Sequence, residues 1–340
     1  MITDHQGRPR GAGATAEWIA RPLFINTGSK TEARSRNGKQ AAVALNNQGS
    51  AFRYEELTMK IIDMTHLMNV HTPGWVGYAG NKMYYAQNLQ TKQIVAQRID
   101  TALHVGTHID GAMHGTDGMG DMASYSMDFL VGPGAVVDIS QHMHDWAVIT
   151  PEMIEAAPVE IKEGDILIIH TGWQRYWEGK PEQDLVRYFC MHPGGKIELL
   201  NWMLEKKIKW FGIDAGSGDH AMNTSIRHMR PDLAKRFEKQ VGMTCDEFFG
   251  EYSYTHKKSG REVVEDIFPF HAYAFQEGLI HAENVGGDIE LMLNKRAIIG
   301  AFPWRYEGLE ASPCRILAFE GMDESVEAVG DAAKAIFKRS

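Results

Sequence analysis

The sequence predicts an α/β protein built around one large domain. Short runs of β-branched and aliphatic residues, over residues 135–139 and 166–169, alternate with stretches of helical periodicity. A helix predicted over residues 196–207 leads directly into a strand over residues 209–213. Alternation of this kind is typical of a sheet covered by helices.

Local signals place the other elements in order. Residues 1–54 are rich in Gly, Asn, Gln and Arg and contain only short apolar stretches, so they are expected to form an N-terminal extension, either wrapped over the core or a neighbouring subunit, or a flexible tail. The domain is expected to span residues 55–340. Thr150 followed by Pro151 predicts the start of a helix. A further helix is expected over residues 325–337.

Composition limits the classes of function. A chain of 340 residues that is 44% hydrophobic can bury a large core, and a net charge of −9 without a Lys/Arg cluster argues against a nucleic-acid partner. The three cysteines are far apart and lack CxxC spacing, which indicates neither a disulfide framework nor a thiolate zinc site and fits a reducing cytoplasm. No apolar run approaches the roughly 18 residues of a membrane span, and the N-terminus lacks an apolar signal region. We therefore expect a cytoplasmic protein that acts on a small molecule, without a membrane or nucleic-acid partner.

The most informative segment is residues 104–114, HVGTHIDGAMH, which holds three histidines and a carboxylate. Its β-branched residues favour an extended backbone, which would place His104, His108 and Asp110 on one face. Gly106 lies on that same face and, without a side chain, would leave space for an ion between the two imidazoles. Two histidines and one carboxylate suit Zn²⁺, Mn²⁺ or Fe²⁺ with open positions for water and substrate.

The longer pattern resembles the HxGTHxDxPxH signature of the cyclase family of metal-dependent hydrolases, which includes kynurenine formamidase- and isatin hydrolase-like enzymes. The match differs at Ala112, where the family usually has proline. The resemblance extends over residues 61–319, with further similar blocks in the family's order at residues 62–66, 72–75, 164–173, 210–217 and 309–315. In the last block, Glu310 and Ala311 replace expected small residues.

The resemblance implies the swivelling β/β/α fold of this family and a divalent metal centre, Zn²⁺ or Mn²⁺, with one or two ions per chain. In the formamidases a histidine and a glutamate twelve positions apart complete a two-metal centre, and His271 and Glu283 have this spacing. His281 is a competing candidate that we rank below His271, and an aromatic-packed His271 is the structural alternative. By the same resemblance, Trp75 is expected to line the substrate pocket.

The stretch of residues 218–269 is longer than the resemblance leads one to expect. A connection of this length is usually a lid, a binding loop or an oligomer contact. A helical subunit contact is equally compatible with its sequence. We expect a homo-oligomer, either a dimer or a tetramer.

The resulting hypothesis is an amidohydrolase that cleaves a C–N amide bond, most plausibly in a cyclic or aryl amide, through a metal-activated water. His114 is assigned the proton-transfer role, with a fourth-ligand or hydrogen-bonding role as the alternative. A lactone or ester hydrolase stays open, as does a metal-dependent lyase or cyclase without net hydrolysis. The non-enzyme alternative is a metal-binding protein that has lost catalysis.

Overall fold

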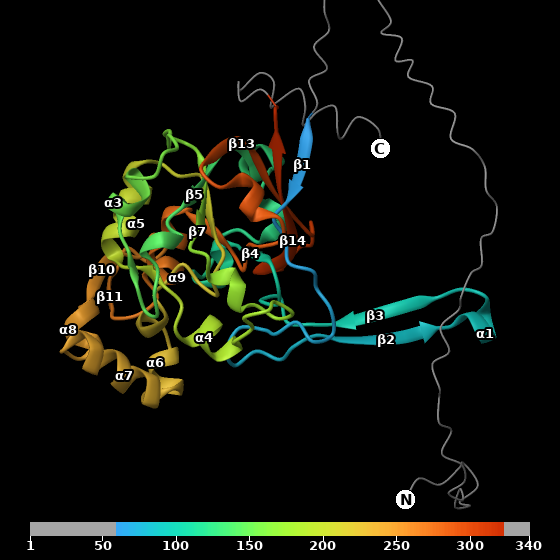
Figure 1. Ribbon diagram of the computed structural model, residues 1–340, viewed down its shortest axis with the longest axis horizontal. Helices are drawn as coiled ribbons and strands as arrows, with labels where there is room; N and C mark the ends of the chain where they lie inside the picture. Colours follow the sequence, from blue (N-terminus) through green and yellow to red (C-terminus); the bar gives the residue numbers. More distant parts are fainter. Residues whose placement is uncertain (1–58, 323–340) are drawn as a thin grey trace, which may run out of the picture. The chain divides into compact units, whose positions relative to one another are not determined.

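Seven strands close into a barrel-like ring in the computed structural model, which describes residues 59–322 (Figure 1). Around the ring they follow the order β14 (Ala311–Glu320), β13 (Lys295–Pro303), β5 (Val131–Asp138), β7 (Ile166–His170), β9 (Trp210–Ile213), β12 (Ile280–Glu283) and β4 (His108–Asp110). An eighth strand, β1 (Lys60–Asp63), pairs with the end of β14. This architecture confirms the predicted α/β class.

Closure of the ring depends on β14, which changes partner along its length. Its first residues, Ala311 to Pro313, pair with β4, and its later residues pair with β13. The β5, β7, β9 and β12 strands run parallel, whereas β4 is antiparallel to both of its neighbours, β12 and β14. Strand β4 therefore lies between two segments that are far from it in the sequence.

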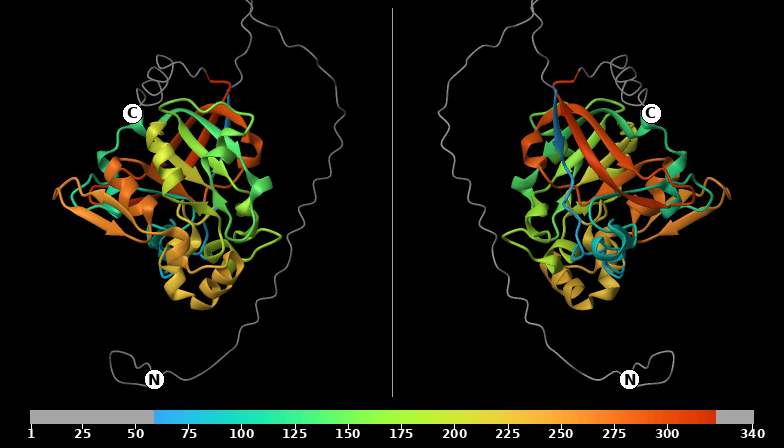
Figure 2. Two further views of the ribbon diagram at one scale, coloured as in Figure 1. Left: turned by 90° about the vertical axis from the view of Figure 1, so that its left-hand side faces the viewer. Right: turned by 90° about the vertical axis from the view of Figure 1, so that its right-hand side faces the viewer.

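Alternate residues of the ring strands face opposite sides, as the pleat requires. One cluster fills the enclosed side with residues from all seven ring strands, including Ile109, Val136, Ile168, Trp210, Ile280, Ala282, Ile299 and Ile316. A second cluster packs the other face against helices (Figure 2). These helices are α3 (Pro151–Glu155), α4 (Leu185–Cys190), α5 (Ile197–Glu205), α6 (Ile226–Met229), α7 (Pro231–Val241), α8 (Cys245–Phe249) and α9 (Pro269–Glu277).

Several predicted elements are present with shifted ends. The helix predicted over 196–207 is α5, and the strand after it is β9. Thr150 occupies the N-cap position of α3, but its side chain makes no capping hydrogen bond. The N-terminal extension at residues 1–54 and the helix predicted over 325–337 lie outside the described residues.

Residues 218–269 contain α6, α7, α8 and a hairpin of β10 (Tyr252–Thr255) and β11 (Glu262–Glu265). Helix α7 buries Leu233 and Phe237 in the helix-side cluster, so this stretch belongs partly to the core. Two short strands, β6 (Val148–Ile149) and β8 (Gly194–Gly195), pair with each other. The structure also contains the short helix α2 (Met127–Leu130).

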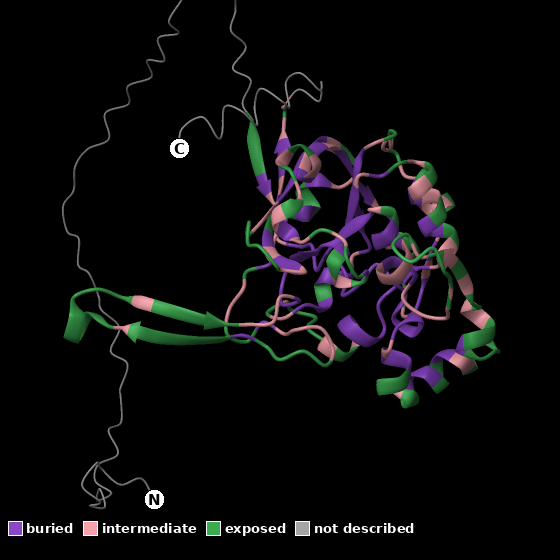
Figure 3. Cartoon of the chain, turned by 180° about the vertical axis from the view of Figure 1, so that it is seen from behind, coloured by how far each residue is buried: buried purple, intermediate pink, exposed green. Residues whose placement is uncertain are grey.

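Strands β2 (Lys82–Gln87) and β3 (Ala96–Asp100) form a hairpin with α1 (Leu89–Lys92) at its turn. Most of its residues are exposed (Figure 3). Within residues 59–322, no helix has the length and apolar character to cross a membrane.

Candidate metal centre

The pairing of β4 with β12 brings together four side chains of types that can bind metal ions. Glu283 lies opposite His108 and His281 lies opposite Asp110 in the antiparallel register. Ile109 and Ala282, between them, point into the enclosed cluster, so the four polar side chains point to the other face of the ring. That is the face covered by α9, which carries the fifth side chain, His271.

His104 reaches the same place through a turn, which corrects the prediction of one extended strand over residues 104–110. Strand β4 begins only at His108, because Gly106 adopts a φ of +69°. A Cβ at Gly106 would contact Thr72 and Met68, so the expectation that this glycine leaves space between the imidazoles is also wrong. Its role is conformational: the turn brings His104 back to within 3.2 Å of His108, measured between Nδ1 and Nε2.

Three of the predicted ligands form a first group. Asp110 Oδ1 lies 3.1 Å from His104 Nδ1 and 3.3 Å from His108 Nε2. The Nδ1 of His108 lies 2.9 Å from the Gly106 carbonyl oxygen. When Nδ1 carries the proton and donates it to this carbonyl, the lone pair of Nε2 is directed at the group.

A second group forms around the other oxygen of Asp110. His281 Nε2 lies 3.5 Å from Asp110 Oδ2 and 3.3 Å from Glu283 Oε1. His271 Nε2 lies 3.7 Å from each of the same two oxygens. The other oxygen of Glu283, Oε2, lies 3.6 Å from His108 Nε2 in the first group. Both carboxylates therefore extend one oxygen toward each group.

The residues present fit a metal centre. Both oxygens of Asp110, Oε1 of Glu283 and both ring nitrogens of His281 are buried and have no hydrogen-bond partner among the described residues. Burying polar atoms without partners is costly. Ligand atoms bonded to one ion at about 2.0–2.2 Å lie roughly 3–3.6 Å apart, which is close to the separations found here. The atoms are thus arranged around common points.

The electrostatics also favour added positive charge. Burial, and then the charge of Asp110, raises the pKa of Glu283 to about 7. Burial alone would raise the pKa of Asp110, but the neighbouring His104 and His108 imidazoles outweigh it and hold this pKa well below its usual range. Two carboxylates that converge in a buried site repel each other, and divalent cations between them offset that repulsion.

His114 lies at the end of a 3₁₀ turn, η1 (Ala112–His114), and contacts a residue that the sequence analysis did not select. Its Nδ1 is 2.9 Å from Oε2 of Glu310, and the same oxygen is 3.0 Å from Nε2 of His104. Ala112, where the family has proline, donates its N–H to the Tyr125 hydroxyl at 2.8 Å. Proline has no N–H to donate, so this hydrogen bond restrains the turn in its place.

His271 is oriented by a second residue that sequence reasoning missed. Oδ2 of the fully buried Asp219 lies 2.7 Å from His271 Nδ1, and its other oxygen accepts the N–H of Phe270. Gly115 lets the η1 turn approach α9, because a Cβ there would lie 2.1 Å from the carbonyl oxygen of His271. Glu310 could have been suspected as a departure from the family's small residues, whereas Asp219 gave no comparable sequence signal.

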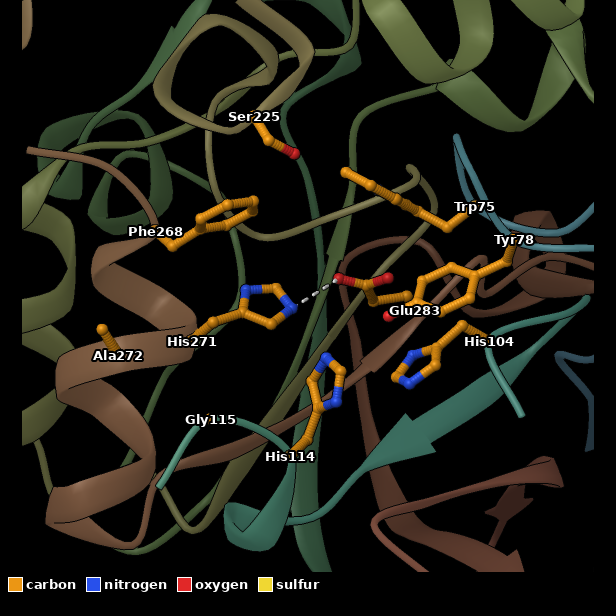
Figure 4. Close-up of a pocket in the computed structure, with 10 residues that line it drawn as sticks. All are labelled: Trp75, Tyr78, His104, His114, Gly115, Ser225, Phe268, His271, Ala272 and Glu283. Carbon is orange, nitrogen blue, oxygen red and sulfur yellow. Dashed lines mark ion pairs between the residues drawn. The ribbon is translucent and has the colours of Figure 1, made fainter. Parts of the chain in front are cut away.

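A cavity of about 330 Å³ opens onto the centre, a volume suited to a small organic molecule. Figure 4 shows His104, His114, His271 and Glu283 pointing into it. Trp75, Tyr78 and Phe268 supply aromatic walls, and Ser225 from the 218–269 stretch also lines it. The structure thus brings all five predicted metal ligands together and places Trp75 and His114 at the same cavity.

Comparison with known proteins agrees with this description. Residues 62–220 match the family model described as putative cyclase. Isatin hydrolase A from Labrenzia aggregata superposes with a TM-score of 0.58 at 20% identity, covering 77% of this chain and 93% of that one.

Two further solved structures support the same fold. Isatin hydrolase A from Ralstonia solanacearum gives a TM-score of 0.57 at 16% identity, with 77% and 92% coverage. A predicted metal-dependent hydrolase from Bacillus stearothermophilus gives 0.52 at 21% identity, with 77% and 98% coverage. A comparison with curated proteins gives no match. These likenesses confirm the fold implied by the sequence resemblance.

Proposed function

We propose, on the basis of the match of residues 62–220 to the putative cyclase family model, that this chain is a metal-dependent hydrolase that cleaves a C–N amide bond. The observation that carries the proposal is the pair of buried carboxylates, Asp110 and Glu283, each extending one oxygen toward each of two histidine groups at the floor of a cavity. A divalent ion held there, Zn²⁺ or Mn²⁺, would supply the acidity that activates water and would polarise the substrate carbonyl.

His114 is proposed to move the proton. Its Nδ1 faces Glu310, so a proton held on Nδ1 leaves Nε2 free to accept one from water and deliver it to the departing nitrogen. Glu310 keeps this ring oriented through that contact. The same carboxylate holds Nε2 of His104, so one side chain orients both the ligand and the base.

The cavity favours an aryl or cyclic amide as the substrate class. Trp75, Tyr78 and Phe268 offer aromatic faces against which a planar ring can stack. Among the described residues that line the cavity there is no Lys or Arg, which disfavours a substrate with several negative charges. A carbonyl placed against the carboxylate–histidine floor would lie beside His114.

The proposal is tested with apo-protein reloaded with Zn²⁺ or Mn²⁺ and incubated with N-formyl anilines, isatins, lactams and lactones. We expect hydrolysis of an amide substrate. A chelator should abolish this hydrolysis, and added metal should restore it. A His192→Leu variant is a matched control, because His192 is also fully buried but lies outside both ligand groups. Turnover of lactones alone, or rearrangement of a substrate without uptake of water, would replace amide hydrolysis with one of the alternative activities. Complete inactivity of the fully loaded protein on the panel would contradict the proposal.

A further inference from the structure

His281 is a buried histidine whose ring is not accounted for by the five ligands that the family resemblance implies. It lies in the middle of β12, directly opposite Asp110, and its side chain is fully buried. Its Nε2 is 3.3 Å from Glu283 Oε1 and 3.5 Å from Asp110 Oδ2. Neither ring nitrogen has a hydrogen-bond partner among the described residues.

A purely structural role explains only part of this arrangement. The His281 ring stacks on Phe275 with a centroid distance of 5.0 Å and lies 5.1 Å from Phe211, as a core side chain would. A structural histidine, however, normally pairs at least one ring nitrogen, as His220 does through the Trp146 carbonyl. At a packing position, leucine or isoleucine would fill the same space without burying unpaired nitrogens.

We propose that His281 is a metal ligand, the fourth protein ligand of the second group. With Asp110 Oδ2, His271 Nε2 and Glu283 Oε1, it gives that group four donor atoms. The first group has His104, His108 and Asp110 Oδ1, with Glu283 Oε2 3.6 Å from His108 as its fourth donor.

Without His281 the second group would have three donors, His271 and one oxygen from each carboxylate. With His281 it has four, the same number as the first group. This inference rests on the proposed function only in that both require a metal centre.

The test measures metal binding, so it does not depend on knowing the substrate. Apo-protein is titrated with Zn²⁺ and with Co²⁺ by calorimetry, and the visible absorption of bound Co²⁺ reports the coordination of each site. We expect two sites in the wild type, with one of them weakened about 100-fold or more in His281→Leu, because even residues that only support a ligand contribute roughly 10–100-fold. His281→Gln, whose amide oxygen reaches near the position of Nε2, should fall between the two.

Two further measurements separate ligation from folding. Apo His281→Leu should be at least as resistant to thermal unfolding as wild-type apo-protein, but should gain less from added metal. His192→Leu should bind metal like the wild type.

The outcomes also separate this inference from the proposed function. Wild-type affinity and an unchanged Co²⁺ spectrum in His281→Leu would overturn the ligand assignment, whatever the enzyme hydrolyses. A site weakened in His281→Leu supports it even if no substrate on the panel is turned over. If the wild type binds a single ion, dependence of that ion on His281 supports the assignment and independence overturns it.

Discussion

Replacing Glu310 with glutamine should lower both turnover and metal affinity, although Glu310 is not itself one of the ligands. The substitution keeps the shape of the side chain but removes the charge that faces His114 Nδ1 at 2.9 Å and His104 Nε2 at 3.0 Å. A hydrogen bond to a charged group contributes about 1.5–3 kcal/mol net. Because the Glu310 side chain is 33% exposed, the lower end of that range, about 1.5 kcal/mol for each contact, is appropriate.

Each contact then corresponds to about a tenfold change, since about 1.4 kcal/mol is a factor of ten. Loss of the His114 contact should reduce kcat about tenfold at saturating metal, and loss of the His104 contact should weaken the first ion about tenfold by chelator competition. Glu307→Gln, an exposed residue in the same loop, is the matched control and should change neither quantity. A Glu310→Gln protein with wild-type kcat and wild-type metal affinity would refute this reasoning.

Three more outcomes are expected. His108→Ala should lose metal and activity together, because one imidazole of a short ligand set has no replacement nearby. Full activity with stoichiometric metal in this variant would exclude His108 from the centre. His114→Ala should keep its metal by elemental analysis while losing about 10²–10⁴-fold in turnover, whereas parallel loss of metal would make it a ligand. Stability of the apo-protein to urea should fall as pH falls below about 6.5, because three histidines outside the ligand groups are held neutral. Burial is the main cause that lowers the pKa of His66 to about 3, His192 to about 4 and His220 to about 3. Above pH 6.5 these histidines are neutral in both the folded and the unfolded protein. Below pH 6.5 only the unfolded protein takes up protons on them, so each histidine lowers the free energy of unfolding by about 2 kcal/mol between pH 7 and pH 5. His192→Leu should reduce this loss of stability by about 2 kcal/mol, the contribution of one such histidine, and an unchanged pH dependence would contradict the assignment.

Much of the fold was predictable because its signals are local. The apolar run of β7 and the amphipathic helix α5 leading into β9 each carry their own periodicity, so the α/β class follows from short windows of sequence. The ends of the elements were less predictable, as with α3, which is only five residues long. Helix ends depend on packing against neighbours that a short window does not contain.

The same division applies to the metal centre. The segment from His104 to His114 concentrates three histidines and a carboxylate within eleven residues, so the sequence by itself predicted a metal centre. It did not determine the backbone path: the left-handed turn at Gly106, and not a continuous strand, brings His104 to His108.

Only the tertiary structure decided how the distant donors join this segment. The antiparallel register of β12 on β4 places His281 opposite Asp110, and the pairing of β14 on the other side of β4 carries Glu310 to His104 and His114. Strand register between segments so far apart in the chain is set by ring closure and by which faces are buried, and neither property is written in a local pattern. For that reason the sequence named most of the candidate ligands, while the fold decided which of them lie close together.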